Sequence, residues 1–375
     1  MTGVEIHGRW MPAFAPVADA FARNVAEGAE TGAAACVVQD GEVALEVWAG
    51  WADAARTQPW TQQTLTPVFS TGKAAVALVM AGLVGRGDLD YDQPVARYWP
   101  DFAQGGKASV TVAQALSHQT GITGLSGPHD PAIWLDRPAA ATAIAAEPVV
   151  FAPGTACAYQ PIVFGHIAGE LARRVDGRSL GVILAEDWVR PLGLDIQIGV
   201  AETDQNRCAE VIRPRAAPNL GELNEETRIA FLKPWSSPKG LGSPAWRAAE
   251  IPGANAHASA SGLARLLGVL ATGGRLGDTR VLAEDTLEAL TRERVAGPNR
   301  VLPFDLSFSA GLIRNSRERV FGLVPGTLGH AGWGGSLAFA DPARGLSFAY
   351  VMNQMTPALI GDERSARMIA ALYAS

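Results

Sequence analysis

The stretch that decides the fold is FSTGKAAVALVM, residues 69–80. A short polar segment places Ser70 at the start of a long apolar run that is typical of a buried helix. Lys73 follows three residues later, so the two side chains share one face if Ser70 begins the helix. The positive end of a helix disfavours an ammonium ion, and shielding from water lowers the pKa of a lysine. The pattern therefore predicts a nucleophilic hydroxyl beside an amine that can accept its proton.

The same spacing has an ordinary explanation, in which a serine caps a helix and an exposed lysine follows in the first turn. Two fixed positions in four residues make a weak motif, and the chain contains a second copy, SSPK, at residues 236–239. That copy lies in a Pro- and Ser-rich loop with no apolar helix behind it, so we reject it. Only four lysines occur among the 375 residues, which reduces the odds of a chance match at Lys73.

The composition indicates a globular protein and argues against two classes of partner. Charged residues make up 18% and hydrophobic residues 48% of a chain long enough for one large domain or two closely packed ones. The net charge of −6 and the lack of a basic run argue against nucleic-acid binding. The longest apolar run follows Lys73 and is too short to cross a bilayer. We therefore expect neither nucleic acid nor membrane as a partner.

The cysteines and the first residues of the sequence bear on location. Cys36, Cys157 and Cys208 are an odd number without paired spacing, as expected for reduced thiols. Residues 1–12 lack the apolar stretch of a secretory signal. We therefore expect a cytoplasmic protein, and the sequence leaves its oligomeric state open.

Strand-like runs lie near both ends of the chain, with helices and loops between them. Asp40-Gly41 joins the first two runs and is a strong hairpin signal. The strand-like runs are Ala33–Val38, Val43–Trp48, Phe308–Ile313, Leu337–Ala340 and Leu346–Met352. Helical patterns occur in Phe14–Ala26, Ile162–Arg174, Leu180–Trp188, Ser261–Thr272, Asp285–Glu293 and Glu363–Tyr373. Residues 214–246 are irregular, and we expect them to shape the mouth of a pocket.

This order predicts one antiparallel sheet, built from both ends of the chain and interrupted by a helical insertion. We expect residues 1–85 and 261–375 to form an α/β domain in which helices flank the sheet. Residues 86–260 are expected to form a helix- and loop-rich domain, with the active site where the two domains meet.

Two further segments carry groups that suit acyl transfer. FAPGTACAY, residues 151–159, is a Pro-Gly turn that leads to Tyr159. A tyrosine in this position usually serves packing, but a phenol near a lysine cation loses its proton more readily and acts as a base. LGHAGWGGS, residues 328–336, combines glycines that permit close backbone approach with a following strand that can present N–H groups. The alternative for this segment is a tight glycine turn with a surface histidine.

Together these segments resemble the serine β-lactamase and penicillin-binding-protein superfamily, and within it the class C β-lactamase-like carboxylesterases of family VIII. Ser70-Thr71-Gly72-Lys73, then Tyr159, then His330-Ala331-Gly332 occur in the family's order, and the likeness extends from the first hairpin to Asn353. The resemblance implies a β-lactamase/transpeptidase-like fold, with a central antiparallel sheet flanked by helices and a helical domain.

The resemblance also implies roles for individual residues. Ser70 would be the acylated nucleophile, and Lys73 and Tyr159 would share a proton and act first as base and then as acid. The backbone N–H groups of Ser70 and Trp333 would form the oxyanion hole. An alternative alignment on Trp333-Gly334-Gly335 moves the second donor to Ser336. Substrate contacts would come from three further residues, His330, Gly332 and Trp235.

Two departures from the β-lactamase pattern bear on the substrate. Tyr159 is followed by Gln160 and Pro161, where those enzymes carry Tyr-x-Asn, so a side-chain amide for the substrate is missing. The segment 330–332, His-Ala-Gly, replaces Lys-Thr-Gly and removes a permanent cation and a hydroxyl, because histidine is mostly neutral near pH 7. Both changes favour neutral, apolar acyl esters and leave the acyl-transfer chemistry intact.

We therefore predict a serine hydrolase, a carboxylesterase that cleaves short-chain esters through an acyl-Ser70 intermediate without a cofactor. β-Lactamase, D-aminopeptidase or acyltransferase activity on the same site is the first alternative, and a ligand sensor without turnover is the second. Gly177-Arg178-Ser179-Leu180-Gly181 matches the nucleophile elbow of another hydrolase fold, but a helix end precedes it, so we assign Ser179 to a helix cap. The six histidines show no metal-binding spacing, so no metal is expected.

Overall fold

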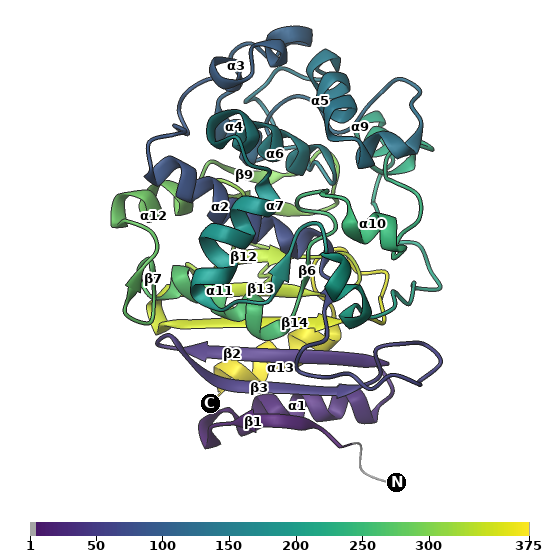
Figure 1. Cartoon of the computed structure of the whole chain (residues 1–375), viewed down its shortest axis with the longest axis vertical. Helices are drawn as coiled ribbons and strands as arrows, with labels where there is room; N and C mark the ends of the chain where they lie inside the picture. Colours follow the sequence, from purple (N-terminus) through teal and green to yellow (C-terminus); the bar gives the residue numbers. More distant parts are fainter. Residues whose placement is uncertain (1–4, 375) are drawn as a thin grey trace.

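Strands from both ends of the chain form a single nine-stranded antiparallel sheet, in the order β1-β3-β2-β14-β13-β12-β11-β10-β9. The computed structural model describes residues 5–374, and Figure 1 shows the N-terminal strands beside the C-terminal ones. The strands are β1 (His7–Trp10), β2 (Gly32–Gln39), β3 (Glu42–Gly50), β9 (Val295–Pro298), β10 (Asp305–Phe308), β11 (Ile313–Arg314), β12 (Leu328–Ala331), β13 (Leu337–Asp341) and β14 (Leu346–Met352). The predicted antiparallel sheet is thereby confirmed.

The contact between the two ends of the chain is a long ladder. Residue pairs run from Leu346 opposite Gln39 to Met352 opposite Ala33, so β14 lies along β2. The predicted hairpin joins β2 to β3. Asp40 and Gly41 in its turn both have positive φ, of 51° and 87°, as the tight turns that match strand twist require.

Helices cover both faces of the sheet. The helices are α1 (Ala15–Ala26), α2 (Lys73–Gly85), α3 (Val95–Tyr98), α4 (Val112–Leu116), α5 (Arg137–Ala146), α6 (Val163–Asp176), α7 (Leu180–Ile183), α8 (Arg190–Leu192), α9 (Glu225–Thr227), α10 (Pro244–Ala248), α11 (Ala260–Ala271), α12 (Glu284–Thr291) and α13 (Glu363–Ala374). On one face α1 and α13 pack together, and on the other α11 packs on β2, β13 and β14. Figure 1 shows these two layers on opposite sides of the strands.

Helix α2 lies at the centre of the molecule. Residues 73–81 are all buried, because α2 contacts β12 and α11 on the sheet side and α6 and α12 on the other. A helix that is apolar all round requires this kind of environment. The nucleophile candidate Ser70 precedes this helix, so it lies where the sheet meets the helical part of the chain.

Residues 86–260 contribute no strand to the nine-stranded sheet and contain α3 to α10. A small sheet connects this segment to the rest, with β4 (Thr66–Pro67) paired to β6 (His257–Ala258) and β6 to β5 (Ile196–Gln197). A two-stranded ribbon, β7 (Arg275–Leu276) with β8 (Thr279–Arg280), follows α11. The division into two domains at residues 85 and 260 stays a prediction.

One predicted strand is wrong in detail. Residues 308–313 do not form a single strand, since β10 ends at Phe308 and β11 begins at Ile313. Gly311 has φ of 99°, and the N–H of Ser309 donates to the carbonyl of Leu312 at 2.9 Å, so the chain turns back on itself. The two short strands pair with each other instead.

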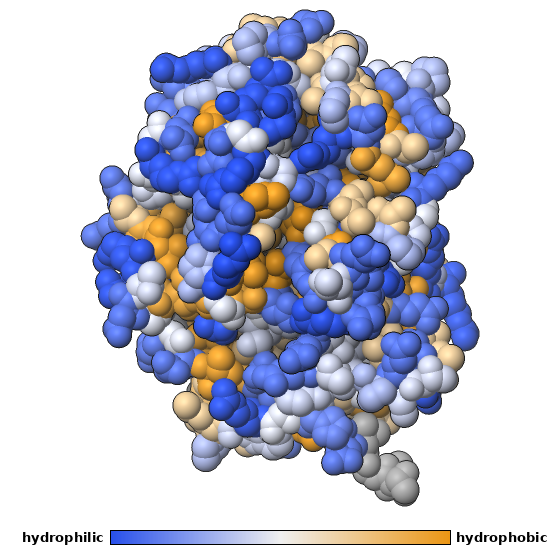
Figure 2. Space-filling model, in the orientation of Figure 1, coloured by the Kyte–Doolittle hydropathy of each residue, from blue (hydrophilic) through white to orange (hydrophobic). Residues whose placement is uncertain are grey.

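The visible surface of the protein is mostly polar. Figure 2 shows hydrophilic residues over most of the visible face, with apolar patches between them. Within residues 5–374, none of the helices combines the length and the apolar character that crossing a bilayer demands.

Candidate active site

The nucleophile candidate lies in a strained turn ahead of α2. Ser70 belongs to the 3₁₀ helix η2 (Phe69–Gly72), which runs directly into α2 at Lys73. Phe69 has φ of 46°, a left-handed conformation that is costly for an aromatic residue and is held only by its surroundings. Its ring packs against Trp333 and Trp246, with centroids 5.6 Å and 6.5 Å away. These contacts fix the backbone at the position where Ser70 turns into the cleft.

Lys73 is fully buried and faces Ser70. Its Nζ lies 3.1 Å from the Oγ of Ser70 and donates to the backbone carbonyls of Pro161 at 2.9 Å and Gly253 at 2.8 Å. Burial disfavours the ammonium ion and lowers the pKa of Lys73 to about 7. The amine is therefore partly deprotonated at neutral pH and lies within reach of the serine proton.

Tyr159 completes a three-residue cluster. Its hydroxyl donates to the Oγ of Ser70 at 2.7 Å, and the Nζ of Lys73 lies 5.1 Å from the ring centroid. Burial raises the pKa of Tyr159, and the hydrogen bond to Ser70 only partly offsets this. The phenol therefore keeps its proton at neutral pH, contrary to the expectation that Lys73 would make it a base. At neutral pH the neutral form of Lys73 can therefore accept a proton, whereas Tyr159 holds a proton that it passes on only if another group replaces it.

His118 also borders the cluster, and the sequence did not identify it as a site residue. Its ring lies 4.7 Å from that of Tyr159 and 4.8 Å from that of Phe308, and its Nδ1 accepts from the N–H of Gln160 at 3.2 Å. Burial, and then the charge of Lys73, hold the pKa of His118 well below its usual range. His118 is therefore an uncharged wall that orients the phenol.

His330 lies near the end of β12, beside Tyr159, with ring centroids 6.3 Å apart. Burial, with a smaller effect from the charge of Lys73, lowers the pKa of His330 to about 3, so the ring is neutral. Its Nδ1 lies 2.8 Å from the carbonyl oxygen of Ala331, which makes Nδ1 the protonated nitrogen. The Nε2 atom then has a free lone pair, and it has no partner among the described residues.

The turn after β12 is fastened to the backbone next to Ser70. Ser336 Oγ donates to the carbonyl of Val68 at 2.9 Å and lies 3.0 Å from Thr71 Oγ1. A Cβ on Gly332 would lie 2.4 Å from the same carbonyl of Val68, so only glycine permits this approach. Ser336 is fully buried behind the turn, whereas Trp333 lines the cavity in front of Ser70. This arrangement favours the N–H of Trp333 over that of Ser336 as the second oxyanion donor.

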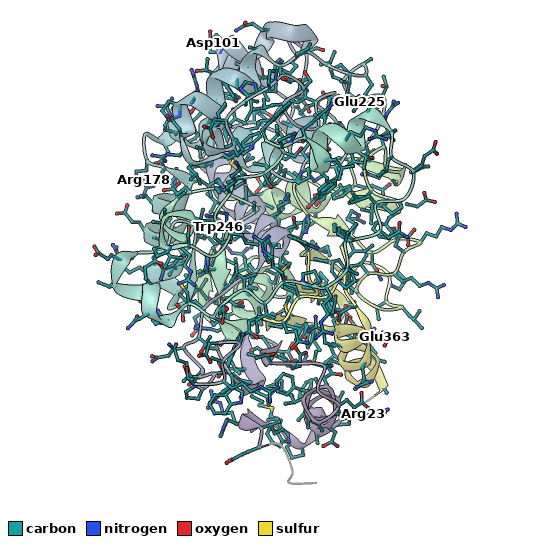
Figure 3. The ribbon with its side chains drawn as sticks, turned by 90° about the vertical axis from the view of Figure 1, so that its right-hand side faces the viewer. Arg23, Asp101, Arg178, Glu225, Trp246 and Glu363 are labelled. Carbon is teal, nitrogen blue, oxygen red and sulfur yellow. The ribbon has the colours of Figure 1, made fainter. Side chains whose placement is uncertain are left out.

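A cavity of about 390 Å³ opens beside the cluster. Ser70, Tyr159 and His330 border it, and most of its other lining residues are apolar. The irregular segment 214–246 supplies part of the lining, as expected for a pocket wall. These lining residues are Ala217, Pro218, Leu220, Ala230, Phe231, Leu232, Ser236, Ser237, Pro238, Leu241 and Trp246. Figure 3 labels Trp246, which lies near the middle of the molecule.

Trp235 does not take the predicted position. It is absent from the cavity lining, and its indole N–H donates to the carbonyl of Leu125 at 2.8 Å while its own carbonyl accepts from Trp134 at 2.6 Å. These hydrogen bonds turn the ring toward the helical part of the chain. Trp246, which the sequence did not single out, lines the cavity instead.

Within residues 5–374, no lysine amine and no histidine ring is hydrogen-bonded to either of the two decoy serines. Ser179 caps α7 by accepting from the N–H of Val182 at 3.3 Å, and its hydroxyl donates to Glu250. Ser236 is buried and donates to the carbonyl of Ile229 at 2.7 Å, while Lys239 is exposed. Among the described residues no group of three or more His, Cys, Asp or Glu side chains is arranged to hold a metal ion.

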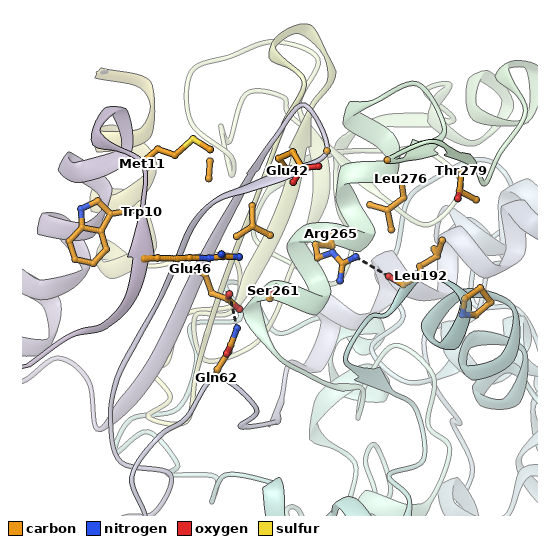
Figure 4. Close-up of a pocket in the computed structure, with 16 residues that line it drawn as sticks. Trp10, Met11, Glu42, Glu46, Gln62, Leu192, Ser261, Arg265, Leu276 and Thr279 are labelled. Carbon is orange, nitrogen blue, oxygen red and sulfur yellow. Dashed lines mark hydrogen bonds between the residues drawn. The ribbon is translucent and has the colours of Figure 1, made fainter.

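A second hollow, of about 860 Å³, lies between β1 and β3 on one side and α8, α11 and the β7–β8 ribbon on the other (Figure 4). Glu46 there accepts from Gln62 at 2.9 Å, and Arg265 donates to the carbonyl of Leu192 at 3.0 Å. Its lining carries charges of both signs and none of the three clustered residues. The arrangement suited to acyl transfer therefore belongs to the smaller cavity.

The geometry defines a protein with a Ser-Lys-Tyr cluster at the edge of an antiparallel sheet, and the comparisons with known proteins agree. A model of the β-lactamase family matches residues 17–373, and the chain belongs to that family. It is 34% identical to esterase/beta-lactamase LipL of Mycobacterium tuberculosis, over 96% of this chain and 85% of that one. These findings confirm the predicted superfamily.

Two solved structures share the whole fold. A penicillin-binding protein homologue from Caulobacter crescentus has a TM-score of 0.96 and 48% identity, with 99% of each chain covered. A family VIII carboxylesterase has a TM-score of 0.93 and 40% identity, with 99% of this chain and 100% of that one covered. The predicted β-lactamase/transpeptidase-like fold is therefore confirmed.

Proposed function

We propose that this protein is a serine hydrolase that cleaves small carboxylic esters through an acyl-Ser70 intermediate. One observation carries the proposal: Ser70 Oγ lies within 3.1 Å of a buried amine and 2.7 Å of a phenol, at the wall of a largely apolar cavity. The names of the relatives, an esterase/beta-lactamase and a family VIII carboxylesterase, support the same reaction class.

The first half of the reaction is acylation. Lys73, neutral in part of the population, accepts the proton of Ser70 as Oγ attacks the ester carbonyl carbon. The backbone N–H groups of Ser70 and Trp333 stabilise the negative charge on the carbonyl oxygen. The phenol of Tyr159 gives its proton to the departing alkoxide, and the proton taken up by Lys73 restores the phenol. The alcohol leaves, and the acyl group stays on Oγ.

The second half is hydrolysis of the acyl-enzyme. A water molecule takes the place of the alcohol and gives one proton to the pair formed by Lys73 and Tyr159 as its oxygen attacks the acyl carbon. The bond from the acyl carbon to Oγ then breaks, and the same pair returns the proton to Ser70. The apolar lining supports acyl and alcohol groups without charge near the bond that is broken.

Two matched serine variants test this proposal. Ser70→Ala should abolish hydrolysis of p-nitrophenyl butyrate and the mass increase of an acyl adduct, whereas Ser179→Ala should keep both. Loss of activity in Ser179→Ala with activity retained in Ser70→Ala would contradict the assignment. An adduct on the native protein that persists for hours without release of acid would favour the ligand-sensor alternative.

β-Lactam hydrolysis is a second candidate, because the relative from Mycobacterium tuberculosis carries both names. The residues after Tyr159 argue that it is the weaker activity. Gln160 is buried and its amide donates to Thr120 Oγ1 at 2.6 Å and to the carbonyl of Ile122 at 2.9 Å, so it points away from the cavity. Pro161 has no side-chain amide. We expect kcat/KM to be higher for p-nitrophenyl butyrate than for a cephalosporin.

The cytoplasmic location stays a prediction that rests on the three cysteines. Cys36 and Cys157 are buried, and Cys208 is partly buried; all three are free thiols. The predicted role of His330 in substrate binding gains support from its place in the lining of the cavity. Gly332 is absent from the lining, so we propose that its part is to let the Trp333 turn approach Ser70.

A further inference from the structure

The lining of the cavity beside Ser70 includes one residue with a permanent charge. Of the described residues that line it, Arg213 alone has a charged side chain, and none is acidic. Arg213 is exposed, and it makes no hydrogen bond or ion pair with any other residue of the range 5–374. A guanidinium without a protein partner at the wall of a largely apolar cavity is free to take an anionic ligand.

The backbone fixes the position of Arg213 even though its side chain reaches solvent. The neighbouring Ile212 donates to the carbonyl of Asn353 at 3.0 Å and accepts from the N–H of Met355 at 2.9 Å. On the other side, Pro214 restricts Arg213 to extended backbone conformations. The residue is therefore held between two constraints and belongs to the cavity wall.

The segment that holds Arg213 also holds the turn with the second oxyanion donor. Just after Met355, the N–H of Thr356 donates to the carbonyl of Gly334 at 3.0 Å, and the N–H of Gly334 donates to the carbonyl of Ala358 at 2.9 Å. Arg213 and Trp333 are thus attached to one short piece of backbone that follows β14. A substrate held at Ser70 therefore lies in a cavity whose lining includes Arg213.

The negative net charge of the protein does not cancel the attraction between Arg213 and an anion in the cavity. The net charge is −6, but charges more than about 10 Å away are largely screened at 0.1 M salt. Within the lining, no carboxylate competes for the guanidinium. The planar fork of arginine matches a carboxylate with two parallel hydrogen bonds.

We propose that Arg213 binds a carboxylate carried by the substrate at a distance from the bond that is broken. The inference rests on the proposed function and narrows it: the preferred substrates are acyl compounds that are apolar around the reacting carbonyl and carry a free carboxylate beyond it. Monoesters of dicarboxylic acids fit this description. β-Lactams also carry such a carboxylate, but for them the site lacks the side-chain amide that Pro161 replaces, so we expect them to be the weaker substrates. The ordinary alternative is an arginine whose stem packs in the wall while its head stays in water.

Two substrates of equal length separate these possibilities. The p-nitrophenyl esters of valeric acid and of glutaric acid differ in that a terminal methyl group is replaced by a carboxylate. We expect Arg213→Gln to lower the ratio of kcat/KM for the glutarate to kcat/KM for the valerate by about tenfold, and Arg213→Glu to lower it further. Arg215, two residues on, is also exposed but lies outside the lining, so Arg215→Gln and Arg215→Glu are matched controls.

Each outcome is decisive. A cephalosporin, measured in the same way, shows which kind of substrate carries the carboxylate. If the Arg213 variants lose kcat/KM on the glutarate, the carboxylate belongs to an ester. If they lose kcat/KM on the cephalosporin alone, it belongs to a β-lactam. Equal ratios for the Arg213 and Arg215 variants on all three compounds overturn the inference while hydrolysis of the valerate upholds the proposed function. If the native protein hydrolyses none of the three, the proposed function itself fails and the inference fails with it.

Discussion

Lys73 is held where its positive charge is costly. It is fully buried, and its Nζ is hydrogen-bonded to Ser70 Oγ and to two backbone carbonyls. The amine also lies over the rings of Tyr159 and Phe164, and no carboxylate within residues 5–374 pairs with it. The carbonyls orient the amine, and burial brings its pKa to about 7. A group with this pKa is the better base of the cluster because burial keeps the proton on Tyr159.

The dependence of activity on pH follows from this pKa. The amine must be neutral to accept the serine proton, so kcat/KM should rise with pH through about 7 and level off above it. A pH series with p-nitrophenyl butyrate, corrected for spontaneous hydrolysis, measures the lower limb. An activity that stays constant from pH 5 to pH 9 would show that Lys73 is not the base. Lys73→Arg, which stays charged, should lose about 10²–10⁴-fold.

The same group should make the stability of the fold depend on pH. The pKa of Lys73 is lower in the folded state than its ordinary 10.5, so between about pH 7 and 10.5 the unfolded chain binds more protons. Stability from this source is therefore lowest below pH 7 and rises toward 10.5, by about 1.4 kcal/mol per pH unit at most. Urea unfolding of the native protein and of Lys73→Met at pH 7, 8 and 9 tests this. The free energy of unfolding of the native protein, relative to that of Lys73→Met, should increase as the pH rises. If the two free energies change with pH in parallel, the prediction is wrong.

A variant of Tyr159 tests the proposed role of its phenol as proton donor. Tyr159→Phe keeps the ring against His118 and removes only the hydroxyl that donates to Ser70. We expect kcat to fall by about 10²–10⁴-fold with little change in thermal stability. A variant that retains more than a third of native kcat would exclude the phenol as proton donor. Circular dichroism melting serves as the control for folding.

The turn between β12 and β13 carries Trp333, the proposed oxyanion donor, and is held beside η2 by its contact with Val68. The hydroxyl of Ser336 donates to the carbonyl of Val68. Gly332 lies so close to the same carbonyl that any side chain on it would collide. The turn also lies against α13, since Arg364 donates to the carbonyl of Gly334 at 2.8 Å. The position of the Trp333 N–H is thus set by elements from both ends of the chain.

Gly332→Ala tests this placement. The added Cβ would lie 2.4 Å from the carbonyl oxygen of Val68, so the turn must move away from Ser70. We expect kcat to fall by about 10²–10³-fold, as for loss of one oxyanion donor, with a smaller effect on KM. Gly127→Ala is the matched control, because a Cβ there would meet nothing within 4 Å. Equal effects of the two variants on kcat would refute the role of the turn.

Local patterns predicted the elements that carry the chemistry, because each depends on nearby residues. The hairpin turn at Asp40-Gly41 and the apolar helix after Ser70 have their cause within a few residues. The break between β10 and β11 was missed because Gly311 could not be told from an ordinary strand residue before its φ was known. The side chains that surround the site cannot be predicted from local patterns, because His118 is brought to Tyr159 only by the tertiary fold. Trp235 lies in a turn and Trp246 in α10, but both belong to the segment 214–246 that the sequence predicted as irregular, and nothing local distinguishes which of them faces the cavity.

At the scale of the whole molecule, a buried ion pair joins the two ends of the chain. Arg364 in α13 donates to Glu30 Oε2, ahead of β2, at 2.9 Å, and also contacts Asp362. Burial raises the pKa of Glu30 to about 7, although Arg364 acts in the opposite direction. The charge on Glu30 is therefore tolerated only while the guanidinium is present.

Replacing one partner of the Glu30–Arg364 ion pair should lower the free energy of unfolding more than replacing both partners. Arg364→Met should lower the free energy of unfolding by about 3–5 kcal/mol, because the carbonyl of Gly334 loses the guanidinium as donor and Glu30 keeps only the hydroxyl of Tyr350. Adding Glu30→Gln to Arg364→Met should restore part of this loss. Urea unfolding of the single and double variants gives the coupling free energy. Additive effects would show that the ion pair does not couple the two ends.

The ladder between β2 and β14 also has a consequence for biosynthesis. Ser70 leaves the ribosome early, but the strand that lies along β2 and the turn that carries the Trp333 N–H are made in the last eighth of the chain. A nascent chain therefore exposes its serine and lysine long before it can stabilise a tetrahedral intermediate. Translation products that stop short of β14 will be inert, and esterase activity in a cell extract will count only polypeptides whose synthesis has gone to the end.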